Sequence, residues 1–188
     1  MKRLITSVAM LAFAMASTAH AGGNEYGWSI SASSTDPDLN TGAIPQSVPT
    51  NTYLWLECTA NDGMSAAEMD IEATGLLFLS FVPMNGVLNA GAGPALLLAV
   101  GGCPSGPFMA GAISVLDASG LGGSICPVPS AANGSNVTVN CDPINPMALN
   151  NSSIGFATTG GSPCVNESMP CIVPVEDQSW GAVKSLYR

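Results

Sequence analysis

The sequence contains almost no basic side chains. Only four of its 188 residues are Lys or Arg, and two of these, Lys2 and Arg3, stand at the extreme N-terminus. No basic residue lies between Gly22 and Val183. A protein that binds nucleic acid needs a basic patch to neutralise phosphates, and anionic membrane surfaces likewise attract basic clusters. The composition therefore excludes nucleic acid as a partner and disfavours an anionic membrane surface.

Histidine is scarcer still, because the single one, His20, also lies close to the N-terminus. Catalytic sites of the Ser-His-Asp and Cys-His kinds need an imidazole, and so does a histidine-ligated zinc site. The chain after His20 can build none of these. Any catalysis by that part of the chain would have to rest on carboxylates alone.

The first 21 residues have the three-part pattern of a secretory signal peptide. Lys2 and Arg3 form a basic start, Leu4–Met15 is mostly apolar, and Ala19–Ala21 is an A-x-A cleavage site. The apolar run is too short to span a bilayer, and the later apolar stretch Leu76–Val100 is broken by Pro and Gly. We therefore expect a secreted or cell-surface protein with no membrane span after signal removal. Its mature chain carries two basic residues against 13 acidic ones, a net charge of −11.

Six cysteines follow the leader, an even number that indicates disulfides in an exported chain. No C-x-x-C motif is present, so a metal site is disfavoured. Sequence alone does not fix the pairing. The order along the chain suggests three pairs: Cys58–Cys103, Cys126–Cys141 and Cys164–Cys171.

Short apolar or alternating runs separated by Gly, Pro, Asn and Ser predict an all-β fold, a single disulfide-stabilised β-sandwich over residues 22–174. Two runs, Leu76–Val82 and Pro94–Gly101, are continuously apolar, as in central strands covered on both faces. The segments 35–50 and 160–174 are expected to be loops. The predicted strands are Tyr26–Ser33, Thr52–Thr59, Ala66–Ala73, Leu76–Val82, Pro94–Gly101, Phe108–Leu116, Asn136–Cys141 and Ser152–Thr159.

The run Ala66–Ala73 admits two interpretations. Its apolar and acidic residues alternate, as on a strand with one buried and one wet face. Ser65 and Glu68 also fit a helix capping box, but Gly75 would end that helix after about two turns. We favour the strand.

Residues 175–188 differ from the rest and predict a short C-terminal helix or tail. Ser179 can cap such a helix, and Lys184 and Arg188 suit its C-terminal end. Trp180, Val183 and Tyr187 would share one face. Nine residues do not hold a helix alone in water, so this segment would dock on a surface or serve as a sorting signal.

Three stretches resemble the cohesin-like and related immunoglobulin-like β-sandwich modules of secreted bacterial proteins. They are Thr52–Cys58, then Gly63-Met64 followed by Ala66–Ala73, then Leu76–Val82 with the Gly-rich turn 86–93. The resemblance implies a nine-stranded sandwich used for protein–protein adhesion rather than catalysis. The cysteines at 58, 103, 126 and 141 depart from that pattern. The ending Ser179-Trp180-Gly181 through Arg188 is similar to a short C-terminal ending of secreted bacterial proteins, which implies either an export or attachment address or a structural element of the family.

Alternating carboxylates at Glu68, Asp70 and Glu72 are the one candidate catalytic set. Neighbouring members would lie about 6.5–7 Å apart on a strand, a separation that glycoside hydrolysis allows. A solvated strand face accounts for them without chemistry, and we favour that interpretation.

Two further sets are candidate binding sites. Asp36, Asp38 and Asn40 place oxygen ligands at alternate positions, which suits calcium, although the spacing does not continue as an EF-hand. An Asx-turn loop explains the same residues. Tyr26 and Trp28 would share a strand face, where they could stack on a sugar ring if exposed or fill the core if buried.

The leading hypothesis is a non-catalytic, cofactor-free extracellular module for adhesion or assembly, which binds a protein partner or itself. A carbohydrate-binding module using Tyr26 and Trp28 is the first alternative. A carboxylate-only glycosidase using Glu68, Asp70 or Glu72 is the second.

Overall fold

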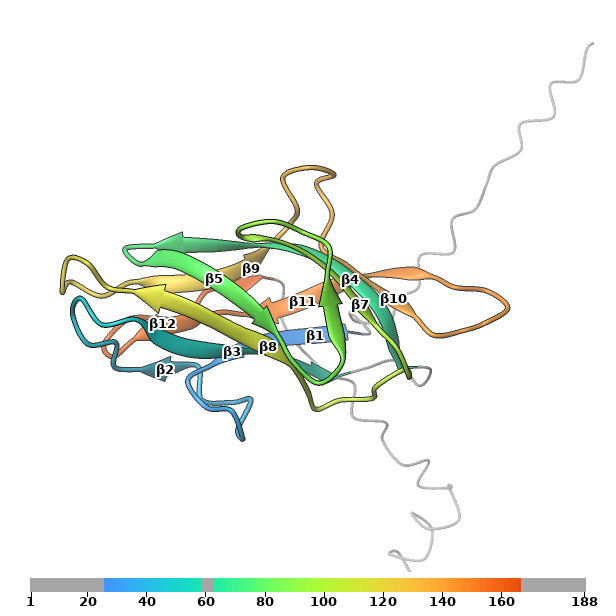
Figure 1. Cartoon of the computed structure of the whole chain (residues 1–188), viewed down its shortest axis with the longest axis horizontal. Coiled ribbons are helices and arrows are strands. Elements are labelled where there is room, and N and C mark those ends of the chain that lie inside the picture. Colours follow the sequence, from blue (N-terminus) through green and yellow to red (C-terminus); the bar gives the residue numbers. More distant parts are fainter. Residues whose placement is uncertain (1–25, 59–62, 167–188) are drawn as a thin grey trace, which may run out of the picture.

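The computed structural model describes residues 26–58 and 63–166, which contain strands and no helix (Figure 1). The predicted signal peptide, the tail 175–188 and Cys171 lie outside the described residues, as does the side chain of Cys58. Within these ranges no helix is long and apolar enough to cross a membrane. The strands are β1 (Tyr26–Ser31), β2 (Thr41–Gly42), β3 (Thr50–Cys58), β4 (Met64–Thr74), β5 (Leu77–Pro83), β6 (Val87–Asn89), β7 (Ala95–Val100), β8 (Phe108–Leu116), β9 (Ser124–Val128), β10 (Val137–Asn140), β11 (Ala148–Ile154), β12 (Phe156–Thr158) and β13 (Val165–Asn166).

The strands form two layers that share β11 (Figure 1). One layer has the order β5-β8-β3-β1-β11-β13, with β1 and β11 parallel. In the other layer, β7 pairs with one edge of β4, and β6 pairs with the far edge of β7. Along the other edge of β4, its first half pairs with β10 and its second half with β9. The first half of β11 pairs with β10 and its second half with β1, so this strand passes from one layer to the other.

The core lies between the layers and is built by alternation along the strands. In β4 the apolar residues Ala67, Met69 and Ile71 are buried, whereas the acidic residues between them face outward, which confirms the strand interpretation over the helix. The largest buried side chain is Trp28 of β1, whose indole N–H donates a 3.0 Å hydrogen bond to the Thr138 hydroxyl of β10. This bond satisfies a polar group that has no access to water.

Neither of the two continuous apolar runs is covered on both faces, so the prediction that they are central, doubly covered strands was wrong. β5 is an edge strand that pairs only with β8, and Leu77 and Val82 on it are about half exposed. In β7, Leu96 and Leu98 are buried while Leu97 between them is exposed. An apolar run does not show whether its second face is covered, because large exposed apolar residues are common on protein surfaces.

The fold contains more short strands than predicted. The expected loops 35–50 and 160–174 contain β2 and β13, and β6 and β9 had not been predicted. The expected strand Ser152–Thr159 divides into β11 and β12 at Gly155. A Cβ atom at Gly155 would collide with the Cys164 sulfur and the Ile125 carbonyl, so the close approach of the chain requires glycine here.

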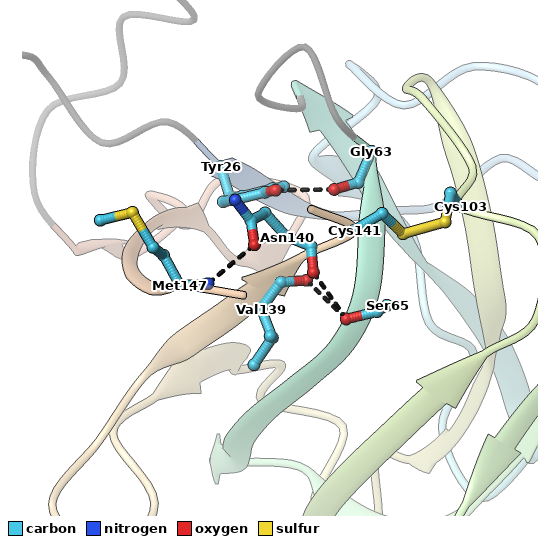
Figure 2. Close-up of a disulfide and its surroundings, with 8 residues drawn as sticks. All are labelled: Tyr26, Gly63, Ser65, Cys103, Val139, Asn140, Cys141 and Met147. Atoms are coloured by element: carbon cyan, nitrogen blue, oxygen red, sulfur yellow. Dashed lines mark hydrogen bonds between the residues drawn. A yellow bond between two sulfur atoms is a disulfide. The ribbon is translucent and has the colours of Figure 1, made fainter. Parts of the chain in front are cut away.

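All three predicted disulfide pairs are wrong. Cys103 pairs with Cys141, and Cys126 pairs with Cys164. Each bond joins cysteines 38 residues apart rather than neighbours in the sequence. Figure 2 shows the first bond, which ties the β7–β8 loop to the end of β10, beside the Ser65 hydroxyl that donates to the carbonyls of Val139 and Asn140. Spacing favoured short loops, whereas the fold places the ends of distant strands together.

The segment 32–40 covers the outer side of β1 and β3. Ser29 and Ser31 of β1 donate to the Pro37 and Asp36 carbonyls. The Trp55 indole of β3 donates to the Ser33 carbonyl. As a result every residue of β1 is buried, although only alternate ones face the core. The segment 32–40 therefore closes the outer face of the layer over β1.

Candidate functional site: an acidic and apolar sheet face

The outer side of β4 carries Glu68, Asp70 and Glu72 in a row, and these carboxylates form the most concentrated charge on the described surface. Register places Leu97 of β7 and Val137 of β10 on either side of Glu68. In the next outward row, Leu88 of β6 lies opposite Ala99 of β7. Directly paired residues share one side of a sheet, so these side chains lie together. We call this surface the acidic face and define it by Glu68, Asp70, Glu72, Leu88, Leu97 and Val137.

The apolar members of the acidic face are well exposed. Leu88 is 71% exposed and Leu97 is 48% exposed, although both lie on regular strands. Exposed apolar side chains bordered by polar groups are typical of a protein-binding surface. A sugar-hydrolysing cleft would instead enclose its carboxylates.

The loop 129–136, which projects at the top of Figure 1, fixes two of the three carboxylates. The Asn133 side-chain amide donates to Glu68 Oε1 at 2.6 Å, and the Ala131 backbone N–H donates to Asp70 Oδ2 at 2.9 Å. The loop is itself closed by bonds between Ser130 and Ser135 and between Gly134 and Ser130. Glu68 and Asp70 therefore position the loop. The glycosidase hypothesis gave these carboxylates a catalytic role, whereas here they have a structural one.

Glu72 differs from its two neighbours. It is exposed and makes no hydrogen bond or ion pair with the described part of the chain. It lies at the mouth of a groove of about 380 Å³ that runs along β9 at one end of the acidic face. The Cys126–Cys164 disulfide lines this groove, and Glu72 is the only charged residue among the described residues of its lining. Apolar walls come from Val128, Pro129 and Val165.

The glycan-stacking prediction for Tyr26 and Trp28 was wrong. Both side chains are fully buried, and each hydrogen-bonds inside the sandwich: Tyr26 through its hydroxyl to the Gly63 carbonyl, and Trp28 to Thr138. A buried ring cannot stack on a sugar. The pattern that places two aromatics on one strand face gives the same signal for a core strand, which is what β1 is.

The calcium candidate folds as a turn. Asp36 Oδ1 accepts a bond from the Asp38 backbone N–H, and the Asn40 side-chain amide donates to the carbonyls of Ile30 and Pro37. Asn40 thus presents N–H groups, not oxygen, to its neighbours. The segment therefore has the Asx-turn structure that was the alternative to a calcium site. Within residues 26–58 and 63–166, no three acidic or cysteine side chains converge as metal ligands would. The absence of a cofactor stays a prediction, with calcium as its weaker alternative.

Two other carboxyl groups have perturbed pKa values for structural reasons. Burial raises the pKa of Glu57; a hydrogen bond with Ser29 opposes the shift, and the nearby Asp38 carboxylate adds to it. Burial would also raise the pKa of Asp117, but it is outweighed by hydrogen bonds from the backbone of Gly122, Gly120 and Ser119 and from the Ser119 hydroxyl, so that the pKa is lowered. Asp117 orders its own loop through these bonds.

A second hollow, of about 460 Å³, lies beyond that loop. Residues 121–124 and 157–162 provide most of its lining, and among the described residues none of the lining side chains is ionisable. It therefore offers no charged group to orient a ligand.

Known structures identify the architecture. No protein-family model matches the sequence, and no curated protein matches it either. The sixth cohesin of scaffoldin B from Acetivibrio cellulolyticus, solved in complex with a Cel5 dockerin, superposes with a TM-score of 0.50 at 11% identity. The alignment covers 72% of this chain and 98% of that cohesin. The chain has a cohesin-like fold.

A second cohesin gives the same result. The seventh type I cohesin of ScaB from Pseudobacteroides cellulosolvens has a TM-score of 0.50 at 5% identity, over 77% of this chain and 97% of that one. The cohesin-like resemblance of the sequence is thus confirmed at the level of fold. Identities this low indicate shared architecture, and the binding residues of this chain have to be argued from its own surface.

Proposed function

We propose that this chain is a non-catalytic extracellular module that binds a protein partner through the acidic face. The observation that carries the proposal is the combination of exposed Leu88 and Leu97 with the carboxylate row of β4 on one flat sheet surface. Apolar groups supply burial on binding, while the charges select a partner and orient its approach. The fold supports this use, since one of the similar cohesins was solved with a dockerin bound.

The partner surface should be basic and apolar. Residues 26–58 and 63–166 contain no Lys, Arg or His, so this part of the chain has no cation of its own to neutralise the carboxylates. A second copy would bring the same negative row and would be repelled. A separate protein therefore suits this face better than self-assembly.

The edge strand β5 is the competing surface. It exposes Leu77, Leu79 and Val82 and carries no charged residue. However, a bulge near Leu79 and the terminal Pro83 interrupt its outer edge, and such features hinder the addition of another strand. The acidic face has both exposed apolar side chains and a row of carboxylates that can select a partner, whereas β5 has no charged residue.

Capture of the partner tests the proposal with matched variants. The immobilised chain would be exposed to culture medium and surface extract of the native host, in three forms: wild type, Leu97→Lys and Val82→Lys. Leu97 is 48% exposed and Val82 is 56% exposed, and the two residues lie on different layers. The two variants therefore introduce the same charge at similarly exposed positions on different surfaces.

A protein retained by wild type and Val82→Lys but lost from Leu97→Lys is the expected result. Its retention should fall as salt is raised, because the carboxylate row is partly exposed and salt screens its charges. Equal retention by all three forms, or loss only in Val82→Lys, would show that the acidic face does not bind the partner.

A further inference from the structure

We infer that the groove beside Glu72 is the anchor site for one arginine side chain of the protein partner. The inference rests on the proposed function and gives the partner a specific chemistry. It begins from a difference among the three carboxylates: Glu68 and Asp70 are bonded to the loop 129–136, whereas Glu72 has no partner among the described residues. Glu72 is thus the member of the row that remains available to an incoming group.

The groove is continuous with the acidic face. Glu72 lies directly opposite Cys126 in the β4–β9 ladder, and paired residues point to the same side of a sheet. Cys164 bonds to Cys126 and is followed at once by β13, so the disulfide brings Val165 to the groove as a wall. A partner that covers Glu68 and Leu97 would therefore reach this groove with the edge of the surface that contacts those two residues.

The lining matches the two parts of an arginine side chain. Val128, Pro129 and Val165 offer apolar surface along which a methylene stem can pack. Glu72 at the mouth offers a carboxylate whose two oxygens fit the guanidinium fork. A guanidinium is also more weakly hydrated than the ammonium of lysine, so it enters a partly apolar groove at lower cost. Arginine is enriched among the residues that dominate interface energies, which suits an anchor.

The charge of the chain points to a cation from outside the sandwich. No basic residue lies within the described ranges to pair with Glu72. The only basic residues after the leader, Lys184 and Arg188, lie outside those ranges. They are the competing occupant, and the test has to separate them from a partner.

The test uses N-acetyl-arginine amide as the probe and follows backbone amide shifts of the full mature chain by two-dimensional NMR. N-acetyl-citrulline amide, which has nearly the same shape without the charge, is the control probe. We expect saturable shifts at residues that line the groove, among them Glu72, Ser124 and Asn166. The apparent affinity should be about tenfold or more weaker for the citrulline probe, because the charge-assisted bond is lost.

Two variants assign the effect to the groove. Glu72→Gln keeps the shape of the side chain and should remove the response to the arginine probe. Asp38→Asn removes one exposed carboxylate from the distant 32–40 segment and should leave the response unchanged. Equal responses to the two probes, or shifts spread evenly over all the carboxylates, would overturn the inference.

The double variant Lys184→Gln, Arg188→Gln tests the competing occupant. If the probe binds the groove only after these charges are removed, the chain's own C-terminal segment fills the groove and the inference about a partner is wrong. Equal binding with and without Lys184 and Arg188 supports a groove that is open to a partner.

The inference and the proposed function can fail separately. Partner retention that is lost in Leu97→Lys but unchanged in Glu72→Gln would leave the acidic face as the binding surface and reject the arginine anchor. Arginine-probe binding that depends on Glu72, together with unchanged retention in Leu97→Lys, would keep the groove and reject the proposed function.

Discussion

The hydrogen bond between Trp28 and Thr138 links the two layers and gives the sharpest stability prediction. Thr138→Val keeps the shape of the side chain but removes the oxygen that accepts from the indole N–H at 3.0 Å. Trp28 and Thr138 are both fully buried, so water cannot replace the acceptor. An unsatisfied buried donor costs about 1–3 kcal/mol. For a chain of this length that corresponds to a fall in Tm of roughly 2 to 12 °C.

A double-mutant cycle separates this bond from other effects of the substitution. In a Trp28→Phe background the donor is already absent, so Thr138→Val should cost at least about 1 kcal/mol less than it does in the wild type. Urea unfolding followed by far-ultraviolet circular dichroism, with disulfides intact, gives the four free energies of unfolding. Thr74→Val, at an exposed position of β4, serves as a control and should change stability by less than about 0.5 kcal/mol. If Thr138→Val costs the same in both backgrounds, the bond contributes nothing and the account of the core is wrong.

Three further predictions concern cross-links and pH. Proteolysis of the unreduced protein, followed by mass spectrometry, should give linked peptides for Cys103–Cys141 and Cys126–Cys164; a Cys126–Cys141 peptide would contradict the topology. Because the pKa of Glu57 is raised in the folded state, its charge destabilises the fold above the ordinary glutamate pKa, so Glu57→Gln should raise Tm at neutral pH and lose this advantage below about pH 4. A constant difference across that range would refute the assignment. The pKa of Asp117 is lowered, so its stabilisation is present above the ordinary aspartate pKa and disappears as pH falls through the folded value; Asp117→Asn should be less stable than wild type at neutral pH and converge with it in acid, and parallel pH profiles would count against its hydrogen bonds.

The sequence predicts the fold class well because alternation is a local property. Phe108–Leu116 is a strand with the predicted bounds, and β4 buries the predicted side of Ala66–Ala73. Each of these depends only on the pattern of apolar and polar residues along a few positions. The cohesin-like resemblance added the layer architecture, which no local pattern contains.

Partners across the fold could not be predicted in the same way. The cysteine pairing depends on which strand ends meet, and Cys126 meets Cys164 only because β9 and β13 approach each other in the folded chain. The burial of Trp28 depends on the layer that lies opposite it, so that the same alternation is consistent with an exposed or a buried aromatic pair. Sequence reasoning identified Glu68, Asp70 and Glu72 as one face, but it offered a signal neither for the loop that binds two of them nor for the groove beside the third.

The most direct test of the account is the footprint of the captured partner, measured by hydrogen–deuterium exchange of the chain alone and in the complex. The account predicts slower exchange in β4, in β7 and in the loop 129–136, with no change in β5 or β8, because the partner covers the acidic face. Protection of β5 and β8 with unchanged exchange in β4 and β7 would place the partner on the other layer and contradict the central claim.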